Sequence, residues 1–124
     1  VRAVLLDRPG EVRLAAGGNR NSTLFGASYA ARTEMVPATT VDAMAGSTRI
    51  DLINYDVEGA EEAALLGSRQ TILRDRPVLA VSLYHRTEDL FNLPLFIRQI
   101  REDYRLYIRR TECLPAWELM LYAV

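Results

Sequence analysis

The chain has 124 residues, of which 49% are hydrophobic and 25% are charged, and its formal net charge is −1. This length and composition predict one soluble globular domain over residues 1–124. The near-zero charge predicts no general affinity for nucleic acid or for an anionic membrane, and no apolar run approaches the roughly 20 residues that cross a bilayer. The only cysteine, Cys113, excludes an intrachain disulfide and favours a reducing compartment, the cytoplasm.

The N-terminal third contains three short segments with strand-like patterns, at residues 2–6, 11–15 and 34–36. A turn with the sequence D-R-P-G joins the first two segments, which predicts a hairpin. The glycine-containing stretch at residues 23–31 is compatible with a strand or with a mobile loop. A brief helix is predicted over residues 41–45, which Thr40 and Asp42 can cap and Gly46 ends.

The clearest pattern begins at residue 50. Residues 50–55 (I-D-L-I-N-Y) predict a strand, which runs into D-V-E-G and then into a helix over residues 60–73 with small residues on one face. Ligand sites of open α/β sheets lie beyond the carboxyl ends of the strands, so Asp56 and Glu58 are candidate site residues. The alternative is that acidic residues stand here because the helix dipole favours them in the first turn.

A second strand and a second helix follow. Residues 78–84 form a nearly continuous apolar run, which is typical of a strand buried on both faces. The next helix is predicted to carry Pro94 in its first turn. Its inward-facing residues are predicted to be Leu95, Phe96 and Ile100.

The two closing strands are predicted over residues 104–109 and 118–124. The loop between them is short and has no helical pattern, so they should be antiparallel. Because strands and helices alternate before this pair, the order predicts an α/β fold with a mostly parallel sheet and a C-terminal antiparallel strand.

Three segments carry a resemblance to a known family: V-P-A-T-T-V-D-A-M (36–44), I-D-L-I-N-Y-D-V-E-G-A-E (50–61) and R-P-V-L-A-V-S-L-Y-H (76–85). In this order they resemble the FkbM-type family of S-adenosylmethionine-dependent methyltransferases. The core D-V-E-G-A-E, with its flanking strand, is the most specific piece. The closing strands are similar too, so the resemblance covers residues 36–124. It implies a class I methyltransferase fold, a Rossmann-like sheet whose last strand is antiparallel.

Two features depart from the family pattern. Asn54-Tyr55 stands where the family commonly has Lys-Ile. In addition, no glycine-rich turn between a strand and a helix is visible that would hold the cofactor, because Gly17-Gly18 precedes no helix. We therefore expect the chain to be the C-terminal portion of a methyltransferase domain, truncated at its N-terminus, with Val1 near the family's third strand.

The resemblance places Asp56 and Glu58 on the cofactor and substrate side of a pocket, where both are candidates for binding the cofactor. A carboxylate near a substrate hydroxyl could accept its proton, so Asp56 is also a catalytic candidate. His85, the only histidine, follows the next strand and is expected to face Asp56, because neighbouring parallel strands end at one edge. It is a candidate general base for methylating a hydroxyl, or else a residue that hydrogen-bonds a loop. Glu61 and Glu62 are expected to be solvated. No Cys/His cluster has metal-ligand spacing, so no metal site is predicted.

The sequence thus predicts an enzyme that transfers a methyl group from S-adenosylmethionine to a hydroxyl of a small molecule or a sugar. The alternative is a non-catalytic remnant or interaction module of the same fold. Missing strands would leave a sheet edge open, and we expect a second copy of the chain in a homodimer, another partner or a rearranged N-terminal hairpin to cover it. The identity of the methyl acceptor stays open.

Overall fold

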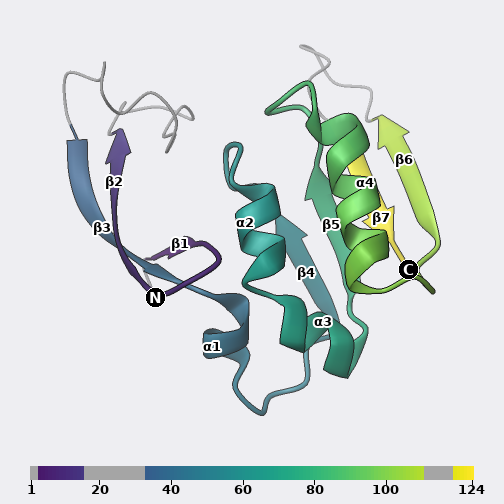
Figure 1. Cartoon of the computed structure of the whole chain (residues 1–124), viewed down its shortest axis with the longest axis horizontal. Coiled ribbons are helices and arrows are strands. Elements are labelled where there is room, and N and C mark those ends of the chain that lie inside the picture. The colour runs from purple at the N-terminus through teal and green to yellow at the C-terminus, as the bar shows by residue number, and fades with distance from the viewer. Residues whose placement is uncertain (1–2, 16–32, 111–118) are drawn as a thin grey trace.

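The structure, a computed structural model, describes residues 3–15, 33–110 and 119–124. The stretch at residues 23–31, the pair Gly17-Gly18 and the loop with Cys113 lie outside the described residues. In chain order the elements are β1 (Val4–Leu5), β2 (Gly10–Ala15), β3 (Thr33–Thr39), α1 (Val41–Ala45), β4 (Leu52–Tyr55), α2 (Glu61–Leu66), α3 (Arg69–Asp75), β5 (Val78–Ser82), α4 (Asp89–Ile100), β6 (Leu106–Arg110) and β7 (Leu119–Ala123) (Figure 1).

The three N-terminal strands form a small sheet of their own, in the order β1-β3-β2. The central strand β3 is parallel to β1 and antiparallel to β2. The predicted hairpin is therefore wrong, because β1 and β2 do not pair with each other. The extended segment predicted at residues 34–36 is longer than expected, and Val4 and Gly10 stand on opposite sides of its Ala38. Hydrogen bonding along both edges of β3 replaces the local pairing.

A second sheet has four strands in the order β4-β5-β7-β6. β4 and β5 are parallel, whereas β7 is antiparallel to both of its neighbours. The α/β class and the antiparallel C-terminal pair are confirmed. A parallel Rossmann-like arrangement is present only in part, because among the described strands parallel pairing is confined to β1–β3 and β4–β5. Within this described sheet, β4 is an edge strand.

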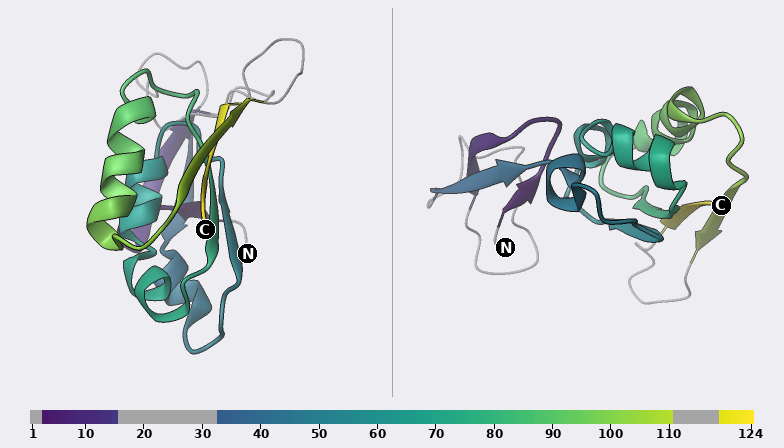
Figure 2. Two further views of the ribbon diagram at one scale, coloured as in Figure 1. Left: turned by 90° about the vertical axis from the view of Figure 1, so that its right-hand side faces the viewer. Right: turned by 90° about the horizontal axis from the view of Figure 1, so that it is seen from below.

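The helices α2, α3 and α4 lie together on one face of the four-stranded sheet (Figure 2). The hydrophobic core lies between these helices and the sheet. β5 contributes Leu79 and Val81 to it and α4 contributes Leu93 and Ile97, all fully buried. Burial of apolar side chains is the main stabilising contribution, so this core fixes β4 and β5 side by side. None of the helices within the described ranges is long and apolar enough to span a membrane.

The helix predicted over residues 60–73 is divided into α2 and α3. The break falls at Gly67 and Ser68. Ser68 donates its hydroxyl to the main-chain oxygen of Ala64 at 2.6 Å, and such a bond to a residue four positions back often bends a helix. The periodicity of the apolar residues continues across the break, which is why it predicted one helix.

Helix α4 begins at Asp89, one turn earlier than predicted, so Pro94 lies inside the helix and not in its first turn. The buried face of α4 carries Leu93, Ile97 and Ile100. Leu95 is 62% exposed, which corrects its predicted inward orientation. Phe96 is partly buried against the core and Ile100 is buried, as predicted.

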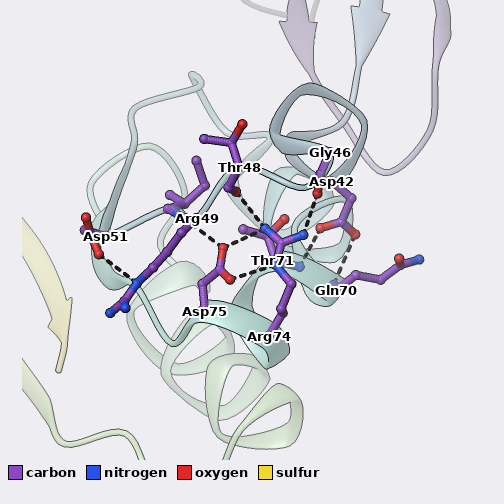
Figure 3. Close-up of polar contacts among 10 residues, drawn as sticks. Asp42, Gly46, Thr48, Arg49, Asp51, Gln70, Thr71, Arg74 and Asp75 are labelled. Carbon is purple, nitrogen blue, oxygen red and sulfur yellow. Dashed lines mark hydrogen bonds and ion pairs between the residues drawn. The ribbon is translucent and has the colours of Figure 1, made fainter.

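Helix α1 is capped as predicted, because Thr40 Oγ1 accepts from the main-chain N–H of Ala43 at 3.0 Å. Asp42 also caps a helix, but not its own. Its two carboxylate oxygens accept from the N–H groups of Gln70 and Thr71, in the first turn of α3, at 3.1 and 2.8 Å (Figure 3). An acceptor at this end of α3 satisfies donors that the helix itself leaves without partners.

The other end of α3 is held by Asp75, which accepts from the main-chain N–H of Ile50 at 2.9 Å and pairs with Arg74 (Figure 3). Arg74 also donates to the main-chain oxygens of Gly46 and Thr48. The pKa of Asp75 is lowered to about 2, mainly by the hydrogen bond from the guanidinium of Arg74. Burial acts in the opposite direction, and the N–H of Ile50 lowers the pKa further. Helix α1 is thus tied to the first turn of α3, and the connection from α1 to β4 is tied to its last turn.

Candidate functional site

Two neighbouring parallel strands end at the same edge of the four-stranded sheet. β4 ends at Tyr55, opposite Val81, and β5 ends one residue later at Ser82. Asp56, the residue after β4, accepts at Oδ1 from the hydroxyl of Ser82 at 3.1 Å and from that of Tyr84 at 2.9 Å. These two donors from the neighbouring strand end fix where the carboxylate lies.

The turn after Asp56 has an unusual backbone. Glu58 has a φ angle of 54° and Gly59 one of 95°. A left-handed conformation suits glycine but costs a residue such as glutamate free energy of order 1 kcal/mol, and strained residues of this kind cluster at functional sites. The turn directs the Glu58 carboxylate toward His85, where its Oε2 lies 3.5 Å from the imidazole Nε2.

His85 stands at the centre of the cluster, with only 9% of its side chain exposed. Its Nε2 lies 3.4 Å from Asp56 Oδ1 and 3.5 Å from Glu58 Oε2, and its Nδ1 lies 2.7 Å from Glu61 Oε1. The structure therefore brings the three predicted site residues together, with Asp56 and Glu58 next to the imidazole ring of His85. Only the Nδ1 contact is short enough for a good hydrogen bond.

The prediction that Glu61 is solvated is wrong, because its side chain is fully buried. Its neighbour Glu62 is exposed, as expected. A signal for this burial was present in the sequence. Glu61 stands three and four positions before Ala64 and Leu65, which are both buried, so it shares their inward helical face.

Ser82 and Tyr84, the two donors to Asp56, are not among the site residues predicted from the sequence. Their spacing of two residues at a strand end, which puts side chains on one face, is a signal that could have linked them. The Tyr84 ring also lies against that of His85, with ring centroids 4.2 Å apart. Burial, followed by the hydrogen bond to the Asp56 carboxylate, raises the pKa of Tyr84 to about 12, so this phenol keeps its proton to a higher pH than an ordinary tyrosine does.

A hollow of about 430 Å³ opens beside this cluster, between the end of β4 and the small sheet. Asp56 and Glu58 line it on one side, and Val4, Leu5 and Leu14 line it on the other. A second hollow, of about 360 Å³, lies on the α2 side of the same turn. The first combines two carboxylates with an apolar wall, which suits a ligand that has a positive charge and apolar parts.

The acidic cluster does not have the geometry of a metal site. Among the residues that the structure describes, no group of three or more His, Cys, Asp or Glu side chains could hold a metal ion. What the cluster offers is a largely buried imidazole nitrogen behind two carboxylates that line a hollow. That arrangement is suited to accepting a proton from a bound hydroxyl.

A family model described as the methyltransferase FkbM domain matches residues 8–106 of the chain. No curated protein matches it. The crystal structure of methyltransferase FkbM from Methylobacillus flagellatus KT is similar, with 33% sequence identity and a TM-score of 0.68. The similarity covers 73% of this chain and 24% of that one, so the chain corresponds to about a quarter of the length of the structure it matches. The resemblance seen in the sequence is confirmed, and the chain belongs to the FkbM methyltransferase family.

Proposed function

We propose that the chain forms part of an enzyme that transfers a methyl group from S-adenosylmethionine to a hydroxyl oxygen of a small molecule or a sugar. Membership of the FkbM family supports methyl transfer as the reaction class. The observation that carries the proposal is the position of His85, whose Nε2 faces Asp56 and Glu58 beside the hollow. In this proposal the acceptor hydroxyl binds next to Asp56 and Glu58, and Nε2 of His85 lies 3.4 and 3.5 Å from their carboxylates.

The residues at this edge fit a cationic methyl donor. Asp56 and Glu58 have half-exposed carboxylates that line the hollow, and their negative charges attract a positively charged ligand. Leu5 and Leu14 offer an apolar surface to the uncharged parts of a ligand. When bound, S-adenosylmethionine would supply an electrophilic methyl carbon on a positively charged sulfur.

In the proposed step, His85 accepts the proton of the acceptor hydroxyl at Nε2. A bond forms between the hydroxyl oxygen and the methyl carbon while the bond from that carbon to sulfur breaks, and its electron pair goes to the sulfur. A positioned base of this kind contributes about 10²–10⁴-fold to a rate. Holding donor and acceptor in line contributes the larger share in reactions of two bound molecules.

A non-catalytic interaction module is the second candidate, and one observation favours it. β4 is an edge strand among the described residues, and its Leu52 is 62% exposed. An open strand edge is a template for pairing with another strand. In this alternative a second copy of the chain pairs along β4 and forms a homodimer. Light scattering on the chain with and without Leu52→Lys tests it: a dimer that the substitution dissociates supports the module.

The proposed activity is tested by calorimetric titration of the chain with S-adenosylmethionine. Because no glycine-rich turn that would hold the cofactor is visible in the sequence, we expect weak but saturable binding, which Asp56→Asn abolishes and Asp51→Asn leaves unchanged. Asp51 is a matched control because it is exposed and precedes the opposite end of the same strand. An absence of binding by the chain would favour the interaction module. Equal binding by both variants would show that the carboxylate of Asp56 does not hold the cofactor.

A further inference from the structure

Glu61 makes two hydrogen bonds through one oxygen. Its Oε1 accepts from the main-chain N–H of Val57 at 3.1 Å and lies 2.7 Å from Nδ1 of His85. Val57 belongs to the turn that carries the candidate site, and Glu61 opens helix α2. One carboxylate oxygen therefore connects the turn, the helix and the imidazole.

These two bonds determine which nitrogen of His85 carries the proton. The Val57 N–H can only donate, so Oε1 accepts from it, and because Glu61 as a carboxylate has no proton to give, Nδ1 donates to the same oxygen. A neutral imidazole has a single N–H, so Nε2 is then left as an acceptor. Nε2 is the nitrogen that faces Asp56 and Glu58 beside the hollow.

The burial of Glu61 is costly for the fold. The side chain is fully buried, and its second oxygen, Oε2, has no hydrogen-bond partner among the described residues. Nearby, Asp89 is also buried, and burial, followed by the charge of Glu61, raises its pKa. A buried polar oxygen without a partner destabilises a protein, so an apolar residue would suit this position better if packing were its only role.

We infer that Glu61 is a positioning residue, which holds His85 in the Nδ1–H tautomer with Nε2 directed at the acceptor hydroxyl. The inference deepens the proposed function and rests on it for the role of Nε2. The tautomer itself is a property of the free chain. It can be measured without cofactor or acceptor, so the two ideas can fail separately.

The test is nuclear magnetic resonance of the imidazole nitrogens, by long-range ¹H–¹⁵N correlation at a pH where the ring is neutral. His85 is the only histidine in the chain, so its signals need no assignment. We expect the proton on Nδ1 in the unmodified chain and in Glu61→Gln, because the glutamine oxygen can still accept. In Glu61→Leu the acceptor is gone, and we expect the proton to move to Nε2, toward Asp56.

Glu62→Gln is the matched control, because it removes one charge from the next, exposed position of α2 and should leave the tautomer unchanged. The unmodified chain tests the inference even if Glu61→Leu fails to fold. A proton on Nε2 in the unmodified chain, or an unchanged tautomer in folded Glu61→Leu, would overturn it. A correct tautomer in a chain that binds no S-adenosylmethionine would instead remove the proposed function and leave Glu61 as the residue that orients His85.

Discussion

The main-chain oxygen of Leu6 lies 2.0 Å from the position that a Cβ atom on Gly67 would occupy. The chain leaving β1 thus packs directly on the backbone at the end of α2. Gly67 has an ordinary helical φ angle of −71°, so conformational freedom is not the reason for glycine here. The close approach is what joins the small sheet to the rest of the molecule at this point.

We therefore predict that Gly67→Ala destabilises the chain by about 1–3 kcal/mol, the usual cost of inserting a methyl group where there is no room. The measurement is chemical denaturation followed by circular dichroism. Gly10→Ala is the control, because a Cβ atom at Gly10 would meet nothing within 4 Å. Equal stability of the two variants would contradict the packing of Leu6 on Gly67.

Asp42 gives a second prediction, because it accepts from two N–H groups at the start of α3. Asp42→Ala should lower the free energy of unfolding by about 1–2 kcal/mol, the typical loss for a helix cap. Asp51→Ala removes an equally acidic residue whose partner, Arg49, is also exposed, and should change the stability by less than about 1 kcal/mol. Thermal unfolding of both variants compares them, and a larger loss in Asp51→Ala would refute the capping role.

The pH dependence of stability follows from Asp75, whose pKa is lowered to about 2 mainly by Arg74. An unfolded aspartate has a pKa of about 3.9, so the folded chain binds this proton less readily than the unfolded chain does. The stabilisation is complete above about pH 4 and is lost as the pH falls toward 2. In Asp75→Asn the unfolding midpoint should depend less on pH in this window. Parallel curves for the two proteins would show that Asp75 does not contribute.

Helix α4 allows one substitution to be compared at two positions. Leu93 is fully buried, whereas Leu95 is 62% exposed. Leu93→Ala should cost about 2–5 kcal/mol through lost burial and the cavity left behind. Leu95→Ala should stay within about 0.5 kcal/mol, because exposed positions tolerate the change. Denaturant midpoints measure both. A similar loss at Leu95 would mean that the helix faces the sheet as the sequence pattern suggested.

Local patterns predicted much of this fold. The strand ending at Tyr55 and the apolar run from Val78 are evident in the sequence, and the parallel pairing expected of these two strands is enough to bring Asp56 near His85. What the patterns lacked were contacts between distant segments. The pairing of β1 and β2 with β3 depends on such contacts, and the bend at Ser68 depends on a side-chain bond that periodicity does not reveal.

Glu61 was missed for a different reason. An acidic residue in the first turn of a helix is usually solvated and is favoured there by the helix dipole. The acidic side chain of Glu61 therefore predicted exposure, although its place on the helix predicted burial. The inward phase set by Ala64 and Leu65 was the better guide. A carboxylate on the apolar face of a helix, next to a strand end with a histidine nearby, is a pattern that points to a site.

In the proposed function, the edge formed by Asp56, Glu58 and His85 binds the methyl donor. The most direct test of this binding is a titration of ¹⁵N-labelled chain with S-adenosylhomocysteine, the demethylated product, followed by nuclear magnetic resonance. We predict saturable shifts of the His85 ring and of the amides of residues 56–59, with the amides of α3 unaffected. Saturable shifts confined to other parts of the chain, or no shifts at any concentration, would contradict the proposal.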